Sequence, residues 1–315
     1  MEAMIEKCAG LDVHQETVVV CVLVGPLEKK PKKSIESFPT TTKGLLKLND
    51  WLMSMKVSDV VMESTGVYWK PVWNILESNF QLVLANARHV KNVPGRKTDV
   101  KDAEWLAKLL RSGLIEGNFV PPEDIRDLRD LTRYRKKLIG NRTAEQNRIH
   151  KILQDANIKL TSVLSNIFGQ SGRRILEAII NGEKIEESDL QEMVHRRIKA
   201  SLTEIADAIN GRIRRHHRDM LQYHWDHMIY LEKTIDKLEE QIDQCLTPYH
   251  KEAELLDTIP GVNKAGAATF IAEMGIDMSV FKSSKHLASW AGVSPGNNES
   301  AGKKKRAKQR KVTKH

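Results

Sequence analysis

Residues 7–24, KCAGLDVHQETVVVCVLV, decide the fold of the first third of the chain. Two runs rich in β-branched residues flank the polar residues 14–16, and this pattern predicts two strands joined by a tight turn. Residues 33–41 could form a third strand, and the short apolar runs at 58–64 and 81–87 predict two more. The first third of the chain is therefore expected to contain a five-stranded sheet.

Helical spacing of apolar residues marks three further segments of this region, which are residues 43–55, 67–79 and 99–114. In the first segment, Leu45, Leu48 and Leu52 recur at the interval that lines one face of a helix. The Ser-Thr-Gly sequence at 64–66 is expected to cap the second helix. The order β-β-β-α-β-α-β-α is typical of an α/β ribonuclease H-like fold, in which helices flank a mixed five-stranded sheet.

The chain becomes mostly helical after Pro121 and Pro122. A basic helix is predicted over residues 128–153, whereas residues 155–200 are polar and mixed and predict short helices at most. The spacing over residues 220–246 predicts a coiled-coil seam. Its apolar positions are Leu221, Trp225, Met228, Leu231, Ile235, Leu238, Ile242 and Cys245. A helix packed within its own domain, a helical hairpin and a dimer contact would each explain this seam.

Residues 253–275, AELLDTIPGVNKAGAATFIAEMG, predict a helix, a Pro-Gly turn and a second helix. This order resembles a helix–hairpin–helix, in which the turn and the following helix offer backbone N–H groups to a phosphate. Gly261 and Lys264 are the candidates for that contact. Asn263 stands where such turns usually have a second glycine, and asparagine also tolerates a left-handed backbone. A hairpin that serves packing alone is the alternative.

Basic residues outnumber acidic ones in this chain. It has 50 Lys and Arg against 41 Asp and Glu, which gives a formal net charge of +9 over 315 residues. The basic residues concentrate at 126–151, 211–219 and 301–315. Three separate clusters favour a nucleic-acid partner, because each neutralised phosphate releases counterions and so adds affinity. Solvated helix faces and a flexible tail are the alternative.

Composition also disfavours several other classes of protein. No apolar run approaches the roughly 18 residues that a membrane span needs. The amino terminus has no apolar signal core, so we expect a cytoplasmic protein. Cys8, Cys21 and Cys245 fit no zinc-binding spacing, which predicts reduced thiols.

Four carboxylates could share one site. In a ribonuclease H-like sheet, the strands that end at Asp12 and Glu63 are neighbours. Asp99 and Asp102 are three residues apart, on one face of a helix. Carboxylates this close would repel each other unless cations lay between them. Mg²⁺ prefers carboxylate ligands. Two such ions about 4 Å apart can support phosphodiester cleavage. Alternatively, Asp99 and Asp102 could serve only to stabilise the amino terminus of a helix through its dipole.

The settings of these four residues carry a resemblance to a known family. The sequences GLDVH around Asp12, VVMESTGVYW around Glu63 and GRKTDVKDAEWLAKLLRSG around Asp99 and Asp102 resemble the DEDD quartet of insertion sequence 110 type transposases. The nuclease domain of that family resembles the RuvC junction resolvases. The resemblance therefore implies a Mg²⁺-dependent DNA transposase or recombinase. No helix-turn-helix or zinc finger is visible in the sequence.

Residues 258–275 and 281–306 resemble the second conserved block of the same family, in which a serine is the nucleophile. The matching residue is Ser300, in NNESAGKKK. The resemblance implies that Ser300 attacks a DNA phosphate and forms a transient phosphoserine link, a step that needs a base or a metal to activate the hydroxyl. Gly302 would let the backbone approach phosphate. Positive charge there would come from Lys303, Lys304 and Lys305. From the residues alone, Ser294 is a rival nucleophile.

The resemblance also implies a noncoding guide RNA, or bridge RNA, that pairs with donor and target DNA. A protein that reads A-form shape needs contacts to the nucleic-acid backbone more than to base edges. The candidates for these contacts are Arg126, Arg129, Arg133, Arg135, Lys136, Lys137, Arg142 and Arg148. Non-specific DNA binding by the same cations is the alternative. A homodimer or tetramer at the nucleoid is expected.

The expected organisation has three parts: a RuvC-like DEDD domain at 1–120, a helical linker and coiled-coil region at 121–250, and a serine transposase domain at 251–315. Family members usually continue with further helices, so the last domain is expected to be incomplete at its carboxyl terminus, which could leave Ser300 without support. Two other functions fit the residues. One is a catalytically impaired nucleic-acid-binding derivative, and the other is a Holliday-junction-resolving nuclease that uses only the carboxylates.

Overall fold

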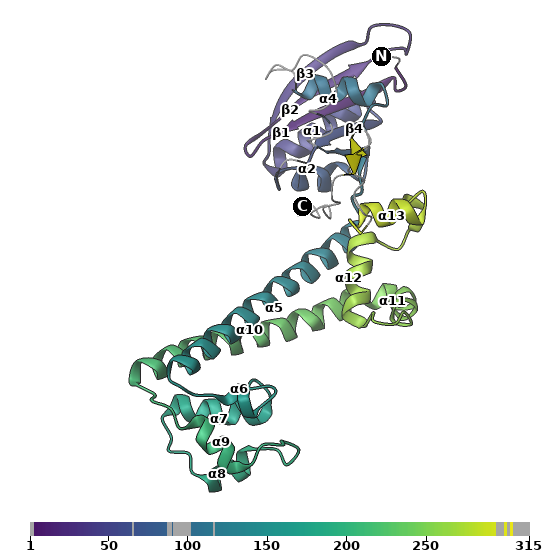
Figure 1. Ribbon diagram of the computed structural model, residues 1–315. Coiled ribbons are helices and arrows are strands. Elements are labelled where there is room, and N and C mark those ends of the chain that lie inside the picture. The colour runs from purple at the N-terminus through teal and green to yellow at the C-terminus, as the bar shows by residue number, and fades with distance from the viewer. Residues whose placement is uncertain are drawn as a thin grey trace. The chain divides into compact units, whose positions relative to one another are not determined.

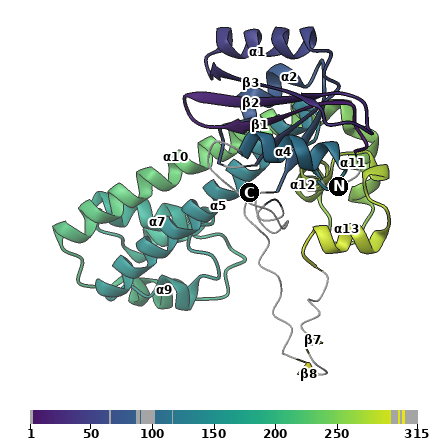
Figure 2. The ribbon, with the colours of Figure 1, turned by 90° about the horizontal axis from the view of Figure 1, so that it is seen from above.

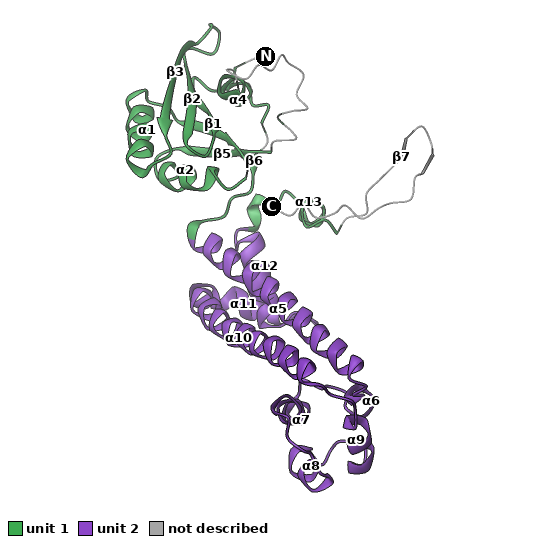
Figure 3. Ribbon diagram, turned by 90° about the vertical axis from the view of Figure 1, so that its left-hand side faces the viewer, with its two compact units in different colours: residues 1–123, 278–315 green, residues 124–277 purple. Residues whose placement is uncertain are grey.

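The computed structural model describes residues 3–64, 66–86, 90, 102–115 and 117–293, and the backbone of residues 299–300 and 303–304 (Figure 1). The chain divides into two compact units (Figure 3). The first combines residues 1–123 with residues 278–315, and the second consists of residues 124–277. The chain thus leaves the first unit near the boundary expected at residue 120 and returns to it after the second unit is complete.

A mixed six-stranded sheet forms the centre of the first unit. Its strands are β1 (Lys7–Val13), β2 (Thr17–Val24), β3 (Lys32–Pro39), β4 (Asp59–Glu63), β5 (Gln81–Ala85) and β6 (Gly117–Asn118). They lie in the order β3-β2-β1-β4-β5-β6. β4 is parallel to β1 and to β5, whereas the other neighbouring pairs are antiparallel. The five predicted strands are confirmed, and β6 adds a short sixth strand that two residues are too few to signal.

Helices cover both faces of this sheet. α1 (Thr42–Ser54) and α2 (Trp69–Leu76) pack on one face, in a core that includes Leu11, Leu48 and Leu76. α4 (Asp102–Arg111) packs on the other face, in a core that includes Cys8 and Leu106. Figure 2 shows α1 and α4 on opposite sides of the sheet. The predicted α/β unit followed by a helical region is confirmed.

The helix after β4 begins later than the sequence predicts. α2 starts at Trp69, and its N-cap position is Tyr68, whose side chain makes no capping hydrogen bond. The expected cap at 64–66 is therefore wrong, because a cap has to stand directly before the first helical turn. The helix predicted over 99–114 is described from Asp102 onward, and residues 99–101 lie outside the described residues.

Two long helices dominate the second unit. α5 (Glu123–Asp155) and α10 (Arg215–Leu246) lie side by side in Figures 1 and 3. Seven of the eight predicted seam positions of α10 are buried, and Cys245 is half-buried. Leu138 of α5 packs with Leu231, Ile235 and Leu238 of α10. The seam is thus covered within the same chain, while a coiled coil with a second copy stays a prediction.

The polar stretch between these helices folds more fully than the sequence predicts. It contains α6 (Leu160–Val163), α7 (Gln170–Asn181), α8 (Glu187–Met193) and α9 (Leu202–Ile209). These short helices share a core with the end of α5 and the start of α10, which includes Ile175, Ile205, Leu153 and Trp225. α7 supplies Ile175, Leu176, Ile179 and Ile180 to this core, whereas α6, α8 and α9 each bury only one or two residues.

Two helices joined by a turn follow α10, as predicted. They are α11 (His250–Asp257) and α12 (Lys264–Met274), and Ala268 and Ile271 of α12 pack on α5 and α10. Gly261 in the turn has a left-handed backbone, with φ at 90°. Asn263 does not: its φ is −102°, and its side chain accepts a hydrogen bond from the backbone N–H of Gly266 at 2.9 Å. Asn263 therefore serves as the N-cap of α12.

The chain re-enters the first unit at Met278. α13 (Ser284–Trp290) follows, and the ring of Phe281 lies 6.2 Å from that of Phe119 and 5.4 Å from that of Trp290, measured between centroids. These ring contacts join the segment at residues 281–290 to Phe119, which directly follows β6. Among the described helices, none is both long enough and apolar enough to cross a membrane.

Candidate active site

Asp12 and Glu63 end two adjacent parallel strands at the same edge of the sheet. The register of β1 and β4 pairs Leu11 with Met62, so the next residue of each strand is one of the two carboxylates. Parallel neighbours advance together, and the side chains of Asp12 and Glu63 therefore belong to one edge. This was the placement on which the predicted carboxylate site depended.

Both carboxylates lie on the face that α4 covers. Side chains two residues apart on a strand share a face. Cys8 and Val61 are buried in the core beneath α4, which assigns Asp12 and Glu63 to the same side of the sheet. Asp102 is the first residue of α4, so the structure brings three of the four predicted carboxylates to one face.

Gly10 shows how closely α4 approaches this edge. A Cβ atom on Gly10 would lie 2.2 Å from the backbone oxygen of Ala103 and 2.4 Å from the backbone nitrogen of Ala107. Only a residue without a side chain fits there, because both atoms belong to the helix backbone. Asp102 directly precedes Ala103, and this contact therefore holds the beginning of α4 over the strand that carries Asp12.

The structure does not by itself define a metal site. Asp12, Glu63 and Asp102 are each half-buried, and Oδ1 of Asp102 is shielded from solvent. Carboxylate oxygens at such an edge are the donors that Mg²⁺ prefers. Within the described residues, however, no group of three or more His, Cys, Asp or Glu side chains is positioned to hold a metal ion. Asp99, the fourth predicted ligand, lies outside the described residues.

Glu104 is close to Asp102 in sequence but has a different role. Its carboxylate lies 2.9 Å from Nζ of Lys33 on β3 and 2.6 Å from Nζ of Lys108 on α4. Hydrogen bonds from Lys108 and Lys33 lower the pKa of Glu104 to about 2. These contacts tie α4 to the sheet and account for Glu104 without a metal.

Arg111, at the carboxyl end of α4, was not identified from the sequence. It is 5% exposed. Nη1 donates to the backbone oxygens of Ile5 and Glu6 at 2.9 and 3.0 Å, and Nη2 donates to those of Gly25 and Pro26 at 3.1 and 2.8 Å. The acceptors lie before β1 and after β2, at the edge away from Asp12. Arg111 therefore fixes the far end of α4.

His14 is a second residue that the sequence reasoning did not single out for the site. Its Nε2 lies 3.1 Å from Oδ2 of Asp12. The spacing Asp-x-His was the available signal, because residues two apart at a strand end can face the same way. A single histidine in a polar turn is common, so this spacing alone did not identify His14 as a site residue.

The buried cysteines of this unit are inert thiols. Burial raises the pKa of Cys8 to about 12 and that of Cys21 to about 11. Neither thiol is therefore ionised near neutral pH, and all three cysteines are unbridged. The prediction of reduced thiols is confirmed for the structure.

Ser300 lies in a short β-hairpin, of which only the backbone is described. β7 (Glu299–Ser300) pairs with β8 (Lys303–Lys304) in antiparallel fashion, with Ser300 opposite Lys303. Gly302, Lys305 and the rival Ser294 lie outside the described residues. The nucleophilic role of Ser300 stays a prediction.

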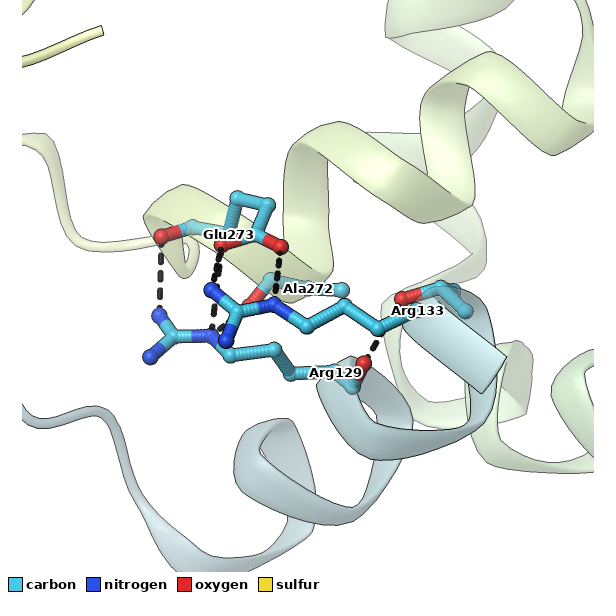
Figure 4. Close-up of polar contacts among 5 residues, drawn as sticks. Arg129, Arg133, Ala272 and Glu273 are labelled. Carbon is cyan, nitrogen blue, oxygen red and sulfur yellow. Dashed lines mark hydrogen bonds and ion pairs between the residues drawn. The ribbon is translucent and has the colours of Figure 1, made fainter. Parts of the chain in front are cut away.

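Arg129 and Arg133, two of the predicted nucleic-acid ligands, bind the end of α12 (Figure 4). Arg129 donates from Nε to the backbone oxygen of Ala272 at 2.8 Å and from Nη2 to that of Glu273 at 2.9 Å. Arg133 binds the Glu273 carboxylate through Nε and Nη2, each at 2.7 Å. Burial raises the pKa of Glu273, but the hydrogen bond from Arg133 and the charges of both arginines outweigh it and leave that pKa below its ordinary value.

Other predicted cations also have partners inside the chain. Arg135 pairs with Glu239, Arg148 with Glu145, and Lys264 with Asp243 at 2.6 Å. The remaining candidates in this unit differ in exposure: Lys136, Lys137 and Gly261 are exposed, whereas Arg126 and Arg142 are half-buried. The exposed lysines are thus the candidates most open to a polyanion, and nucleic-acid binding by the whole set stays a prediction.

Comparison with known proteins places these features in a family. Residues 9–158 match the family model of IS110-type DEDD transposases, and residues 253–315 match that of the IS116/IS110/IS902 transposase family. Pilin gene-inverting proteins of Moraxella bovis and Moraxella lacunata are each 37% identical over 78 residues. That match covers 24% of this chain and 24% of each relative. The two family matches together cover more than half of the chain and follow the two conserved blocks in order, so the chain belongs to the IS110 family of transposases.

Proposed function

We propose that this protein is a DNA transposase or site-specific recombinase that cleaves and exchanges DNA strands with Mg²⁺. The observation that carries the proposal is the placement of Asp12 and Glu63 at one edge of adjacent parallel strands. Asp102 begins the helix packed over that edge. A ribonuclease H-like domain that cuts phosphodiester bonds uses carboxylates gathered in this way. The name of the pilin gene-inverting relatives describes a DNA rearrangement, which is consistent with this chemistry.

Asp12, Glu63, Asp99 and Asp102 would hold the Mg²⁺ ions. Bound there, the ions would stabilise charge on the phosphate under attack and favour deprotonation of the nucleophile. The protein's own contribution is to fix the carboxylates. Gly10 lets α4 approach β1, and Arg111 holds the opposite end of the helix. Preorganised ligands of this kind cost less to assemble when substrate binds.

Ser300 is the proposed nucleophile. Its Oγ would form a bond to a DNA phosphorus while the bond from that phosphorus to the neighbouring nucleotide oxygen breaks. The bond energy is kept in the phosphoserine link, so a second DNA end can displace the serine and complete strand exchange. The described residues 278–293, which lead towards Ser300, belong to the same compact unit as Asp12 and Glu63.

The proposed partners are donor DNA, target DNA and a noncoding guide RNA. Lys136 and Lys137 are exposed on α5 and suit phosphate contacts. The turn at Gly261 and the start of α12 at Lys264 offer a second contact of the helix–hairpin–helix type. A homodimer or tetramer would hold two DNA ends at once. We expect the protein to meet these partners in the cytoplasm, at the nucleoid.

The experiment combines the full chain, the RNA that co-purifies with it, Mg²⁺ and DNA carrying the sequences that flank the gene. Denaturing electrophoresis then detects protein covalently attached to DNA. Asp12→Asn and Ser300→Ala should abolish the adduct, whereas Ser294→Ala should retain it. Cleavage without an adduct, unchanged in Ser300→Ala, would instead identify a junction-resolving nuclease. Binding without any cleavage would identify a nucleic-acid-binding derivative.

A further inference from the structure

We propose that His14 is a positioning residue that orients the Asp12 carboxylate at the strand edge. This inference rests on the proposed metal-dependent function, because it assigns His14 a task at the same site. The observation behind it is the contact between His14 Nε2 and Asp12 Oδ2, at 3.1 Å. A carboxylate oxygen only accepts, so in the tautomer with hydrogen on Nε2 the imidazole donates a hydrogen bond to Oδ2. Oδ2 is then fixed, and the carboxylate can no longer rotate freely about its last torsion.

The turn that carries His14 is itself held by hydrogen bonds. The backbone N–H of His14 donates to the oxygen of Thr17 at 2.9 Å. Thr40, directly after β3, donates from Oγ1 to the backbone oxygen of Gln15 at 2.6 Å and from its backbone N–H to that of Glu16 at 3.0 Å. These bonds anchor three consecutive turn residues to the sheet. The backbone that carries the His14 imidazole is therefore held in place.

A further contact comes from the segment after Glu63. Tyr68, the N-cap residue of α2, lies with its hydroxyl 3.4 Å from Oε1 of Gln15. The turn beside Asp12 thus touches the segment that follows the second strand-end carboxylate. A connection of this kind supports both sides of a site, because it couples the two strand ends through side chains as well as through the sheet.

Exposure distinguishes this role from a packing role. The His14 side chain is 61% exposed and that of Asp12 is 25% exposed. An imidazole so open to solvent contributes little core packing, and an exposed ion pair adds little to folding stability. Carboxylates and histidines that hold a metal are commonly oriented by such hydrogen-bonded neighbours. Removal of His14 should therefore affect cation binding far more than stability.

The experiment measures Mn²⁺ binding to the full chain by titration calorimetry, with thermal unfolding recorded on the same samples. His14→Ala should weaken Mn²⁺ binding by about 10-fold or more, in the range found for residues that orient metal ligands. His14→Gln keeps a side-chain N–H donor and should recover much of the affinity. The unfolding temperature should stay the same in both variants.

The matched control is His250→Ala. His250 is another exposed histidine beside a carboxylate, with Nδ1 3.4 Å from Oε2 of Glu254, but it lies in the second unit. The His250→Ala variant should bind Mn²⁺ with the same affinity as the wild type. If His14→Ala also bound normally while Asp12→Asn did not, the role of His14 would be refuted and the proposed function would stand. If the wild type bound no Mn²⁺, or Asp12→Asn bound it normally, both proposals would fall.

Discussion

Gly10 of β1 lies directly against Ala103 of α4, so that a Cβ atom on Gly10 would come within 2.2 Å of the Ala103 backbone oxygen. Gly10→Ala should therefore push α4 away from the sheet. We expect a loss of about 1–3 kcal/mol in the free energy of unfolding, as for other overpacked cores. Weaker Mn²⁺ binding should accompany it, because α4 begins at Asp102.

Gly140→Ala is the matched control for this change. Gly140 lies inside α5, and a Cβ atom there would meet nothing within 4 Å. Alanine favours a helix, so this variant should gain about 0.5–1 kcal/mol in urea unfolding. Equal stability of Gly10→Ala and the wild type would show that α4 does not rest on β1 as described.

Arg111→Met should destabilise the first unit without touching the carboxylates. The four backbone oxygens that Arg111 binds would lose their charged donor inside the protein. Buried acceptors left without a donor are costly, and we expect a loss of about 3 kcal/mol in chemical unfolding. Arg215→Met, at a side chain that is 95% exposed, should change stability by less than about 0.5 kcal/mol. Similar losses in the two variants would contradict the anchoring role of Arg111.

The lowered pKa of Glu104 predicts that the free energy of unfolding depends on pH in the acidic range. Its pKa falls from an ordinary 4.5 to about 2 because Lys108 and Lys33 donate hydrogen bonds to it. A lowered carboxylate pKa stabilises the fold above the unfolded pKa, and this contribution disappears as the pH falls through the folded pKa. Both lysines are about half exposed, which limits the effect at neutral pH to about 1 kcal/mol.

The comparison of wild type with Glu104→Gln tests this dependence. The difference between their unfolding free energies should be largest near neutral pH and should shrink between pH 4.5 and about pH 2. Glu36→Gln, an exposed substitution on β3, should show no such trend. A difference that stayed constant over this range would argue against the ion pairs of Glu104.

Glu273→Gln should strengthen nucleic-acid binding if the proposed function is correct. Glu273 holds the guanidinium of Arg133 in a two-bond contact, in a position that a phosphate could take. Its neutralisation removes the charge that pairs with Arg133 and should let a phosphate compete for this guanidinium. We expect tighter binding and a steeper salt dependence, by about 0.7–0.9 in the logarithmic slope for one added phosphate contact.

Glu254→Gln makes the same change in net charge on α11, at a side chain that is 70% exposed. Fluorescence anisotropy with a labelled RNA, measured over a series of salt concentrations, compares the two variants. Equal gains in both would mean that net charge, rather than the release of Arg133, sets the affinity.

Periodic patterns predicted the main elements of the fold. The apolar run before His14 and the valine-rich run after it predicted β1 and β2, and the spacing from Leu221 to Ile242 predicted the buried face of α10. Residue composition predicted the wrong start for one helix, because the path of the backbone after β4 determines where that helix begins. Ser64 and Gly66 have the composition of a cap, but α2 begins beyond them.

Contacts between distant segments were the least predictable part of the site. The strand ends of Asp12 and Glu63 could be aligned from the order of elements, because a fold class fixes which strands are neighbours. Nothing in the sequence near Arg111 indicates its four backbone acceptors, which come from two other segments. The partners of Arg129 and Arg133 likewise lie about 140 residues away, at the end of α12.

The second unit is inserted between two parts of the first, and this has a consequence for synthesis on the ribosome. The strands bearing Asp12 and Glu63 emerge early, whereas the segment with Ser300 emerges only after all of residues 124–277. A nascent chain that stalls or is cut within the helical insertion therefore lacks the proposed nucleophile altogether. If Ser300 is the nucleophile as proposed, an unfinished polypeptide could bind a polyanion but could not form a covalent link to it.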